Sequence, residues 1–354
     1  MTVNKRNSGI ELLRIVSMLV IIAHHYVVNS GISEYIMEKS ILSIKDYIIL
    51  IYGWGGKTAI NCFLLITGYY MCGAKVSFRK WLRFLGELEF YLIVIYSIFV
   101  VMGYEQITFG RILKVIFPFR EVSWGFSACY LLFYALIPFL NKLVNSMDQK
   151  EHALLIGVCL LIYTILPSLA ITVIVFNYIT WFCIVYIIGA YIRRYPFMWL
   201  SNKIKTGGLM LGSVLLSWGS VVGFSVLGRM LGKGGHSCYF WVNDVNQILA
   251  VVTAICTFLF FRSFEHFFSG IINRIAASTF GVLLIHANSD AMRQWLWRDK
   301  LNNLSAYEQA FPYWLLHAVV SVIIVYIVCT LIDQGRMYLA DYLRGLFARK
   351  ERTD

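Results

Sequence analysis

Four ionisable side chains interrupt the first apolar stretch of the chain: Glu11, Arg14, His24 and His25. At 100° per residue, Arg14 and His25 lie about 20° apart around a helix and about 16 Å apart along it, so both can line one cavity. Glu11 can pair with Arg14, whereas His24 points about 100° away from His25. An imidazole can take a proton from a hydroxyl group, and an arginine can hold an anion. The alternative is a buried ion pair with two histidines that only pack between helices.

The composition indicates the elements that must position these groups. Of the 354 residues, 59% are hydrophobic and 14% are charged, which excludes an ordinary water-soluble domain. The apolar residues form runs near the length of about 20 residues that crosses a bilayer. We therefore predict an all-α, polytopic integral membrane protein of about ten transmembrane helices, forming one domain over residues 1–354 with no appended soluble domain. The predicted helices are 9–28, 56–72, 84–104, 123–142, 153–169, 171–192, 207–228, 241–261, 271–289 and 313–332.

The net charge is +12, and the distribution of the basic residues along the chain predicts the orientation of the helices. With the N-terminus inside, most of the 31 Lys and Arg residues fall in cytoplasmic segments, as the positive-inside rule requires. We therefore expect a multi-pass protein of the plasma membrane with both termini in the cytoplasm, in contact with membrane lipids and not with nucleic acid. Two outer connections, 29–55 and 105–122, can lie on the membrane surface, and residues 41–52 are expected to form an interfacial helix.

Four motifs in order resemble the acyltransferase 3 family, over nearly the whole chain. IELLRIVSMLVIIAHH resembles the first helix of the family, with its arginine and histidine at Arg14 and His25. NCFLLITGYY resembles the second helix, KWLR resembles a basic R-x-x-R pair at Lys80 and Arg83, and IAASTFGVLLIH resembles a late helix that ends in a histidine, here His286. Lys80 departs from the family arginine; it keeps the charge but not the bidentate geometry.

The resemblance implies transfer of an acyl group, usually acetyl from cytoplasmic acetyl-CoA, to a carbohydrate hydroxyl, with His25 essential. Acetyl-CoA would be a co-substrate; no tightly bound cofactor and no metal site are expected. Arg14, Arg79, Lys80 and Arg83 are the predicted donor-binding residues, because they lie on the side where an anionic donor arrives. His25 can act as a base or can itself carry the acyl group. The sequence leaves both open.

Several polar residues fall at the outer level of the predicted helices. His286 is expected at the depth of His25, because both lie in helices that run outward, so the two histidines are predicted to share one chamber and His286 joins the catalytic set. The acceptor-side candidates are Trp124, Tyr130, Asp244 and Asp290. Trp124 can stack on a sugar ring or only anchor the helix in the interface, and the aspartates can orient a histidine or be solvated at a helix end.

The remaining intramembrane groups have structural interpretations. Glu87 is expected to pair with Arg83 or Arg14, and His317 to pack between helices. The sequence thus predicts a membrane-bound O-acyltransferase that acts on a polysaccharide or lipid-linked glycan. A transporter or flippase for a glycan or a small anion is the alternative, because buried Arg and His also mark transport paths.

Overall fold

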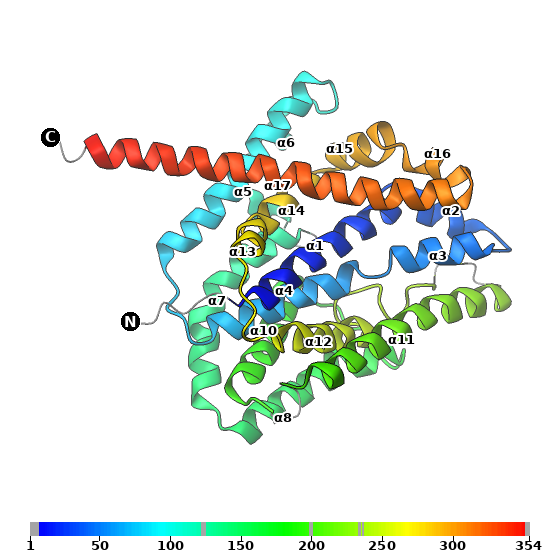
Figure 1. Cartoon of the computed structure of the whole chain (residues 1–354), viewed down its shortest axis with the longest axis horizontal. Coiled ribbons are helices and arrows are strands. Elements are labelled where there is room, and N and C mark those ends of the chain that lie inside the picture. The colour runs from blue at the N-terminus through cyan, green and yellow to red at the C-terminus, as the bar shows by residue number, and fades with distance from the viewer. Residues whose placement is uncertain (1–6, 122–124, 198–200, 233–234, 236, 351–354) are drawn as a thin grey trace.

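A computed structural model describes residues 7–121, 125–197, 201–232, 235 and 237–350. Every regular element among these residues is a helix (Figure 1). The longer helices are α1 (Ser8–Val28), α3 (Ile44–Tyr52), α4 (Gly56–Met71), α5 (Phe78–Val101), α7 (Phe126–Ser146), α8 (Gln149–Leu160), α10 (Tyr178–Arg194), α11 (Lys203–Met230), α12 (Ile248–Arg262) and α17 (Phe311–Lys350). The shorter ones are α2 (Ile32–Glu38), α6 (Phe109–Ile116), η1 (Pro118–Glu121), η2 (Leu161–Ile165), α9 (Leu166–Ser168), α13 (Gly270–Ala276), α14 (Thr279–His286), α15 (Asp290–Arg293), η4 (Gln294–Lys300) and α16 (Asn303–Glu308).

The protein is a multi-pass membrane protein. In the described part of the chain, seven helices are long and apolar enough to cross a bilayer, and a pair bent by 94° between His286 and Asp290 would make an eighth. Each of the ten predicted runs contains helix, but the crossing helices number seven or eight rather than ten. The difference arises mainly at α10 and α12, which have 17 and 15 residues because extended or turn backbone precedes both.

Helix α1 lies in the middle of the bundle and packs against α4, α12, α13, α14 and α17 (Figure 1). Its start is fixed by Asn7, whose side chain accepts a hydrogen bond from the backbone N–H of Gly9. Ser8 donates to Asn273 Oδ1 at 2.8 Å, which ties this start to α13. We call the two ends of the bundle the Ser8 end and the Val28 end, after the first and last residues of α1.

Two glycines bring α4 and α10 into direct backbone contact. An ideal Cβ on Gly68 would lie 2.4 Å from the carbonyl oxygen of Tyr186, and one on Gly189 would lie 2.6 Å from that of Leu65. Any side chain would therefore push the helices apart. Small residues allow such close packing between membrane helices, where dispersion contacts replace the hydrophobic effect.

A partly buried ionic cluster joins α5, α14 and α17. Arg336 Nη2 lies 2.8 Å from both Glu87 Oε1 and Asp333 Oδ1, and the Tyr91 hydroxyl donates to Asp333 Oδ1 at 2.8 Å. An ideal Cβ on Gly281 of α14 would lie 2.2 Å from the same Asp333 oxygen. Glu87 thus pairs with Arg336, and the predicted pairing with Arg83 or Arg14 is wrong. Helical periodicity gave the depth of Glu87 but not the identity of the neighbouring helix.

At the Val28 end, an ion pair and a tyrosine hydroxyl anchor the connection between α1 and α4. Lys39 Nζ lies 3.2 Å from Asp46 Oδ1, and the Tyr307 hydroxyl of α16 contacts both side chains. The predicted interfacial helix over 41–52 exists as α3, but it is not confined to the surface: Asp46, Ile49 and Leu50 are buried, and α3 packs against α1 and α11. In contrast, α6 in the second connection buries none of its side chains.

Candidate functional site

The centre of the candidate site is a pair of histidines, one on α1 and one at the last residue of α14. His25 Nδ1 lies 3.1 Å from His286 Nε2, and the ring centroids are 5.2 Å apart. His286 is fully buried, and Trp297 meets its ring edge-on at 6.5 Å. The shared depth predicted by counting along the two helices is thus present in the structure, where the two rings are also in contact. The shared chamber and the catalytic roles of the two residues stay predictions.

Hydrogen bonds assign the proton positions of the neutral pair. His286 Nδ1 lies 2.6 Å from the carbonyl oxygen of Val282, which can only accept, so Nδ1 carries the proton of His286. His286 Nε2 is then an acceptor, and His25 Nδ1 donates to it. The proton of neutral His25 is therefore on Nδ1, and its Nε2 presents a lone pair. A backbone carbonyl and a second imidazole thus fix the tautomer of His25, as a carboxylate does in a Ser-His-Asp triad.

The neighbouring histidines have other partners. His24 Nδ1 lies 2.6 Å from the carbonyl oxygen of Gly53, and its ring packs on Gly56, where an ideal Cβ would lie 2.5 Å away. His24 therefore faces α4, away from His286, as its position on the helix predicts. His317 Nδ1 lies 2.8 Å from the Tyr26 hydroxyl, which is consistent with the predicted packing role.

Arg14 lies three turns of α1 from His25, about 16 Å along the helix toward the Ser8 end. Its Nε is 3.5 Å from Glu11 Oε2, the predicted pair. The Arg14 side chain keeps 30% of its surface exposed, whereas that of Glu11 keeps 8%. The carboxylate thus offsets part of the arginine charge, and the exposed part of the guanidinium can meet a ligand.

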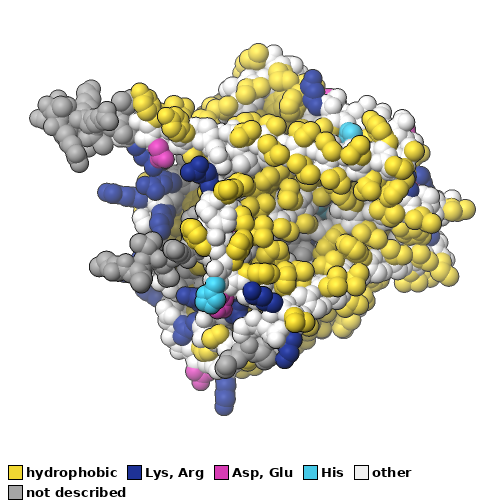
Figure 2. Space-filling model, viewed as in Figure 1, with side chains coloured by type: hydrophobic (Ala, Val, Ile, Leu, Met, Phe, Trp, Pro, Cys, Tyr) yellow, Lys and Arg dark blue, Asp and Glu magenta, His cyan; other side chains and the backbone are white. Residues whose placement is uncertain are grey.

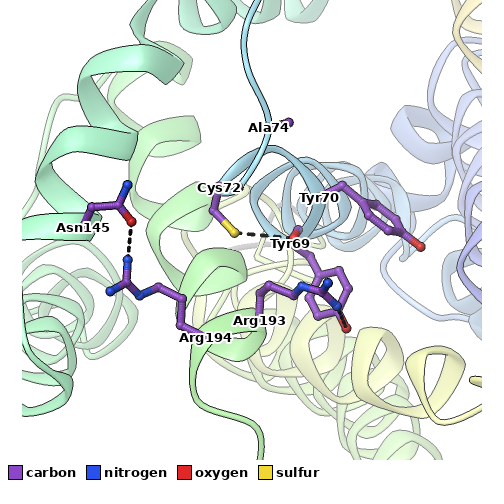
Figure 3. A pocket seen from close by; sticks show the side chains of 8 residues that line it. Tyr69, Tyr70, Cys72, Ala74, Asn145, Arg193 and Arg194 are labelled. Carbon is purple, nitrogen blue, oxygen red and sulfur yellow. Dashed lines mark hydrogen bonds between the residues drawn. The ribbon is translucent and has the colours of Figure 1, made fainter. Parts of the chain in front are cut away.

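A cavity of about 430 Å³ opens at the Ser8 end, where the last turns of α4 and α10 meet the end of α7 (Figure 3). Its polar wall is formed by Tyr69, Asn145, Arg193 and Arg194. Arg193 Nη1 bonds to the Tyr69 hydroxyl at 3.1 Å and lies over its ring, and Arg194 Nη1 bonds to Asn145 Oδ1 at 2.5 Å. The charge at this cavity thus comes from two arginines held by neutral groups.

The basic residues that begin α5 lie close to this cavity in sequence. Gly73 and Ala74 line the cavity, and α5 starts four residues later at Phe78. Arg79, Lys80 and Arg83 are exposed. Figure 2 displays Lys and Arg side chains gathered at the left, the side on which the described chain begins and ends, while hydrophobic side chains cover the middle of this face.

A family model for an acyltransferase domain, Acyl_transf_3, matches residues 7–332. The chain belongs to the acyltransferase 3 family. No curated protein and no solved structure matches it significantly. Membership in this family identifies the chain as a membrane acyltransferase. The matched residues include both histidines and the arginine cavity.

The described acceptor-side candidates, Tyr130, Asp244 and Asp290, are bonded to groups other than the histidines. Tyr130 bonds to Thr67 Oγ1 at 3.1 Å. Thr67 lies about 16 Å along α4 from Gly56, which packs on His24, so Tyr130 is near the depth of Arg14. The sequence analysis expected Tyr130 at the outer level of its helix, whereas its hydrogen bond to α4 puts it nearer the depth of Arg14. Trp124 lies outside the described residues.

The two aspartates are also placed differently from the prediction. Asp244 lies in a turn before α12 rather than on a helix, and its side chain accepts from the backbone N–H of Val245 at 2.7 Å. The Asp290 side chain is 89% exposed and pairs with Arg293 at 2.9 Å. The bend after His286 turns Asp290 away from the bundle. In the described part of the chain, neither carboxylate contacts a histidine, and the side chain bonded to His25 is His286.

Arg193 and Arg194 were missed as ligand-binding candidates. In the sequence they read as two of many basic residues at a helix end, where cations complement the helix dipole. The signal available was the adjacent pair itself, at the end of a run whose partner helix ends in the Gly-Tyr-Tyr of the second family motif.

Proposed function

We propose that this acyltransferase moves an acetyl group from acetyl-CoA to a hydroxyl of an extracellular or cell-wall polysaccharide, or of a lipid-linked glycan precursor. The observation that supports it is the hydrogen-bond chain from Val282 through His286 to His25, which leaves His25 Nε2 as a base. A transfer to a hydroxyl needs such a base, because a neutral hydroxyl is a poor nucleophile. Acetyl-CoA is a co-substrate and no resident cofactor takes part.

In the proposed reaction, His25 Nε2 takes the proton of the acceptor hydroxyl while the hydroxyl oxygen attacks the thioester carbonyl carbon. The carbon–sulfur bond then breaks, and the imidazolium returns the proton to the departing thiolate. While His25 carries both protons, its Nδ1–H donates to His286, and this hydrogen bond to a charged group is worth about 1.5–3 kcal/mol. His286 thus stabilises the imidazolium and keeps the ring in one orientation.

The proposed orientation places the Ser8 end in the cytoplasm and the histidines in the outer half of the plasma membrane. The gathering of Lys and Arg at the Ser8 end supports it, by the positive-inside rule. Arg14, Arg79, Lys80 and Arg83 are proposed to bind the donor on this side. The pantetheine arm would then reach along α1 toward His25, and the glycan would enter from the Val28 end.

The test compares surface glycans of cells with the gene, without it, and with the His25→Ala allele at equal membrane abundance. We expect an acetyl mass to disappear from one glycan in the second and third strains, as seen by mass spectrometry. Unchanged acylation in the His25→Ala strain would overturn the proposal. Loss of glycan export with unaltered acylation would favour the transporter alternative.

A further inference from the structure

The cavity at the Ser8 end has a charge that its own walls do not neutralise. Within the described chain, neither Arg193 nor Arg194 forms a salt bridge, and their hydrogen-bond partners, Tyr69 and Asn145, are neutral. Burial raises the pKa of the Cys72 thiol at the cavity wall, so this thiol stays protonated and adds no negative charge. Two arginines thus share one hollow without a carboxylate to offset them.

The arginines also keep hydrogen-bond donors for a ligand. A guanidinium has five N–H groups in a planar fork, and among the described residues each arginine donates one hydrogen bond to a neighbouring side chain. Tyr69 holds Arg193 by a hydroxyl and by its ring, with the guanidinium carbon 5.0 Å from the ring centroid. Asn145 holds Arg194 from the opposite helix. Figure 3 shows the two side chains leaving the last turn of α10 in different directions, Arg194 toward Asn145 of α7 and Arg193 toward Tyr69 of α4.

We propose that this cavity is a phosphate-binding site in which Arg193 and Arg194, which both line it, bind a phosphate or diphosphate group. Guanidinium forks match the oxygens of a phosphate, and a charge-assisted pair is about twice as strong as a neutral hydrogen bond. The cavity volume of about 430 Å³ is within the range of small-molecule sites. The exposed Arg79 and Lys80, a few residues past the cavity wall, can meet further phosphates of the same ligand.

Two sources can supply this group: the nucleotide part of the acyl donor, or the headgroup of an anionic lipid. Assignment to the donor rests on the function proposed above, whereas the site itself rests on the cavity and its charge. The two sources differ in one respect that can be measured. The nucleotide binds from solution, while the lipid must be present in the bilayer.

The first experiment measures binding of adenosine 3′,5′-bisphosphate to the purified full-length protein in neutral detergent, by calorimetry. This probe lacks a thioester, so binding is independent of turnover and of His25. We expect Arg193→Gln and Arg194→Gln each to weaken binding about tenfold and the double variant about a hundredfold, since a hydrogen bond to a charged group is worth about 1.5–3 kcal/mol. Lysine at either position should restore part of the loss, because it keeps charge but not the fork.

The second experiment places the same proteins in nanodiscs with or without phosphatidylglycerol and measures the lipid-dependent rise in melting temperature. If the occupant is a lipid, the double variant loses this rise while its affinity for the bisphosphate is unchanged. Arg274→Gln is the matched control for both experiments, because Arg274 is an exposed arginine on α13, outside the cavity.

A folded double variant with unchanged bisphosphate affinity and an unchanged lipid effect overturns the phosphate site. Monodisperse elution and a melting temperature in phosphatidylcholine equal to that of the parent protein establish that the variant is folded. If instead the site is verified but the His25→Ala strain still acetylates its glycan, the proposed function fails and the phosphate site stands.

Discussion

The histidine pair and the arginine cavity differ in burial and in how their polar groups are bonded. His286 is fully buried, and each hydrogen bond of the pair has one direction, fixed by the backbone carbonyl of Val282. The arginines lie in an open hollow and are held by side chains that neither neutralise nor fully engage them. Moving one proton requires fixed geometry, whereas holding a charged ligand requires access and uncompensated charge. The construction of the histidine pair therefore suits proton transfer, and that of the arginine cavity suits ligand binding.

The largest effect on activity is expected at the histidine pair. His25→Ala should lower acetyl transfer by at least about a hundredfold, because positioned acid–base catalysis contributes about 10²–10⁴-fold. The variant should still insert, and its donor affinity should be unchanged. His24→Ala is the matched control, since His24 bonds to Gly53 and faces α4. Equal losses of activity in the two variants, measured with purified protein, would contradict the assigned roles.

A smaller loss is expected for the residue that orients the base. His286→Ala leaves His25 Nδ1 without its acceptor, so turnover should fall by about 10- to 100-fold, the value of one hydrogen bond to a charged group. The effect should appear in kcat rather than in donor affinity. His286→Gln should recover part of the loss, because an amide oxygen can accept from Nδ1. Full activity of the alanine variant would limit the site to α1.

Substitution of the predicted donor-binding residues should change the affinity for the donor rather than kcat. Removing the charge of Arg14, Lys80 or Arg83 should weaken acetyl-CoA binding, by roughly tenfold where a charged hydrogen bond is lost. Lys80→Arg should be tolerated, since the charge remains. The measurement is a direct binding titration for each variant. A double variant of Lys80 and Arg83 with unaltered affinity would place the donor elsewhere.

The smallest effect should come from the cluster that positions α14. Gly281→Ala brings a methyl group against the Asp333 carboxylate, so α14 must shift, and His286 lies five residues further along the same helix. We expect a several-fold loss in kcat with normal donor binding. Gly335→Ala is the control, because no atom outside α17 lies within 4 Å of a Cβ at Gly335. If both variants are equally active, α14 tolerates the shift.

What the sequence could predict follows from helical geometry. The spacing of Arg14 and His25, the direction of His24 and the shared depth of His25 and His286 all depend on rise and rotation along single helices, and the structure has each of them. The partner of Glu87, the depth of Tyr130 and the turn at Asp244 depend on which helices pack together and where they start. The site at Arg193 and Arg194 also depends on which helices pack together, because the cavity forms only where α4, α7 and α10 meet.

The backbone contact at Gly68 and Gly189 decides which wall of the cavity can yield. Helices α4 and α10 touch at these glycines, so their backbones have no room to approach further. Helix α7 carries the third wall, and it contains Pro138, which removes one internal hydrogen bond and makes bending easier. If the proposed phosphate site is correct, bending of α7 at Pro138 is the simplest way to admit ligands of different size.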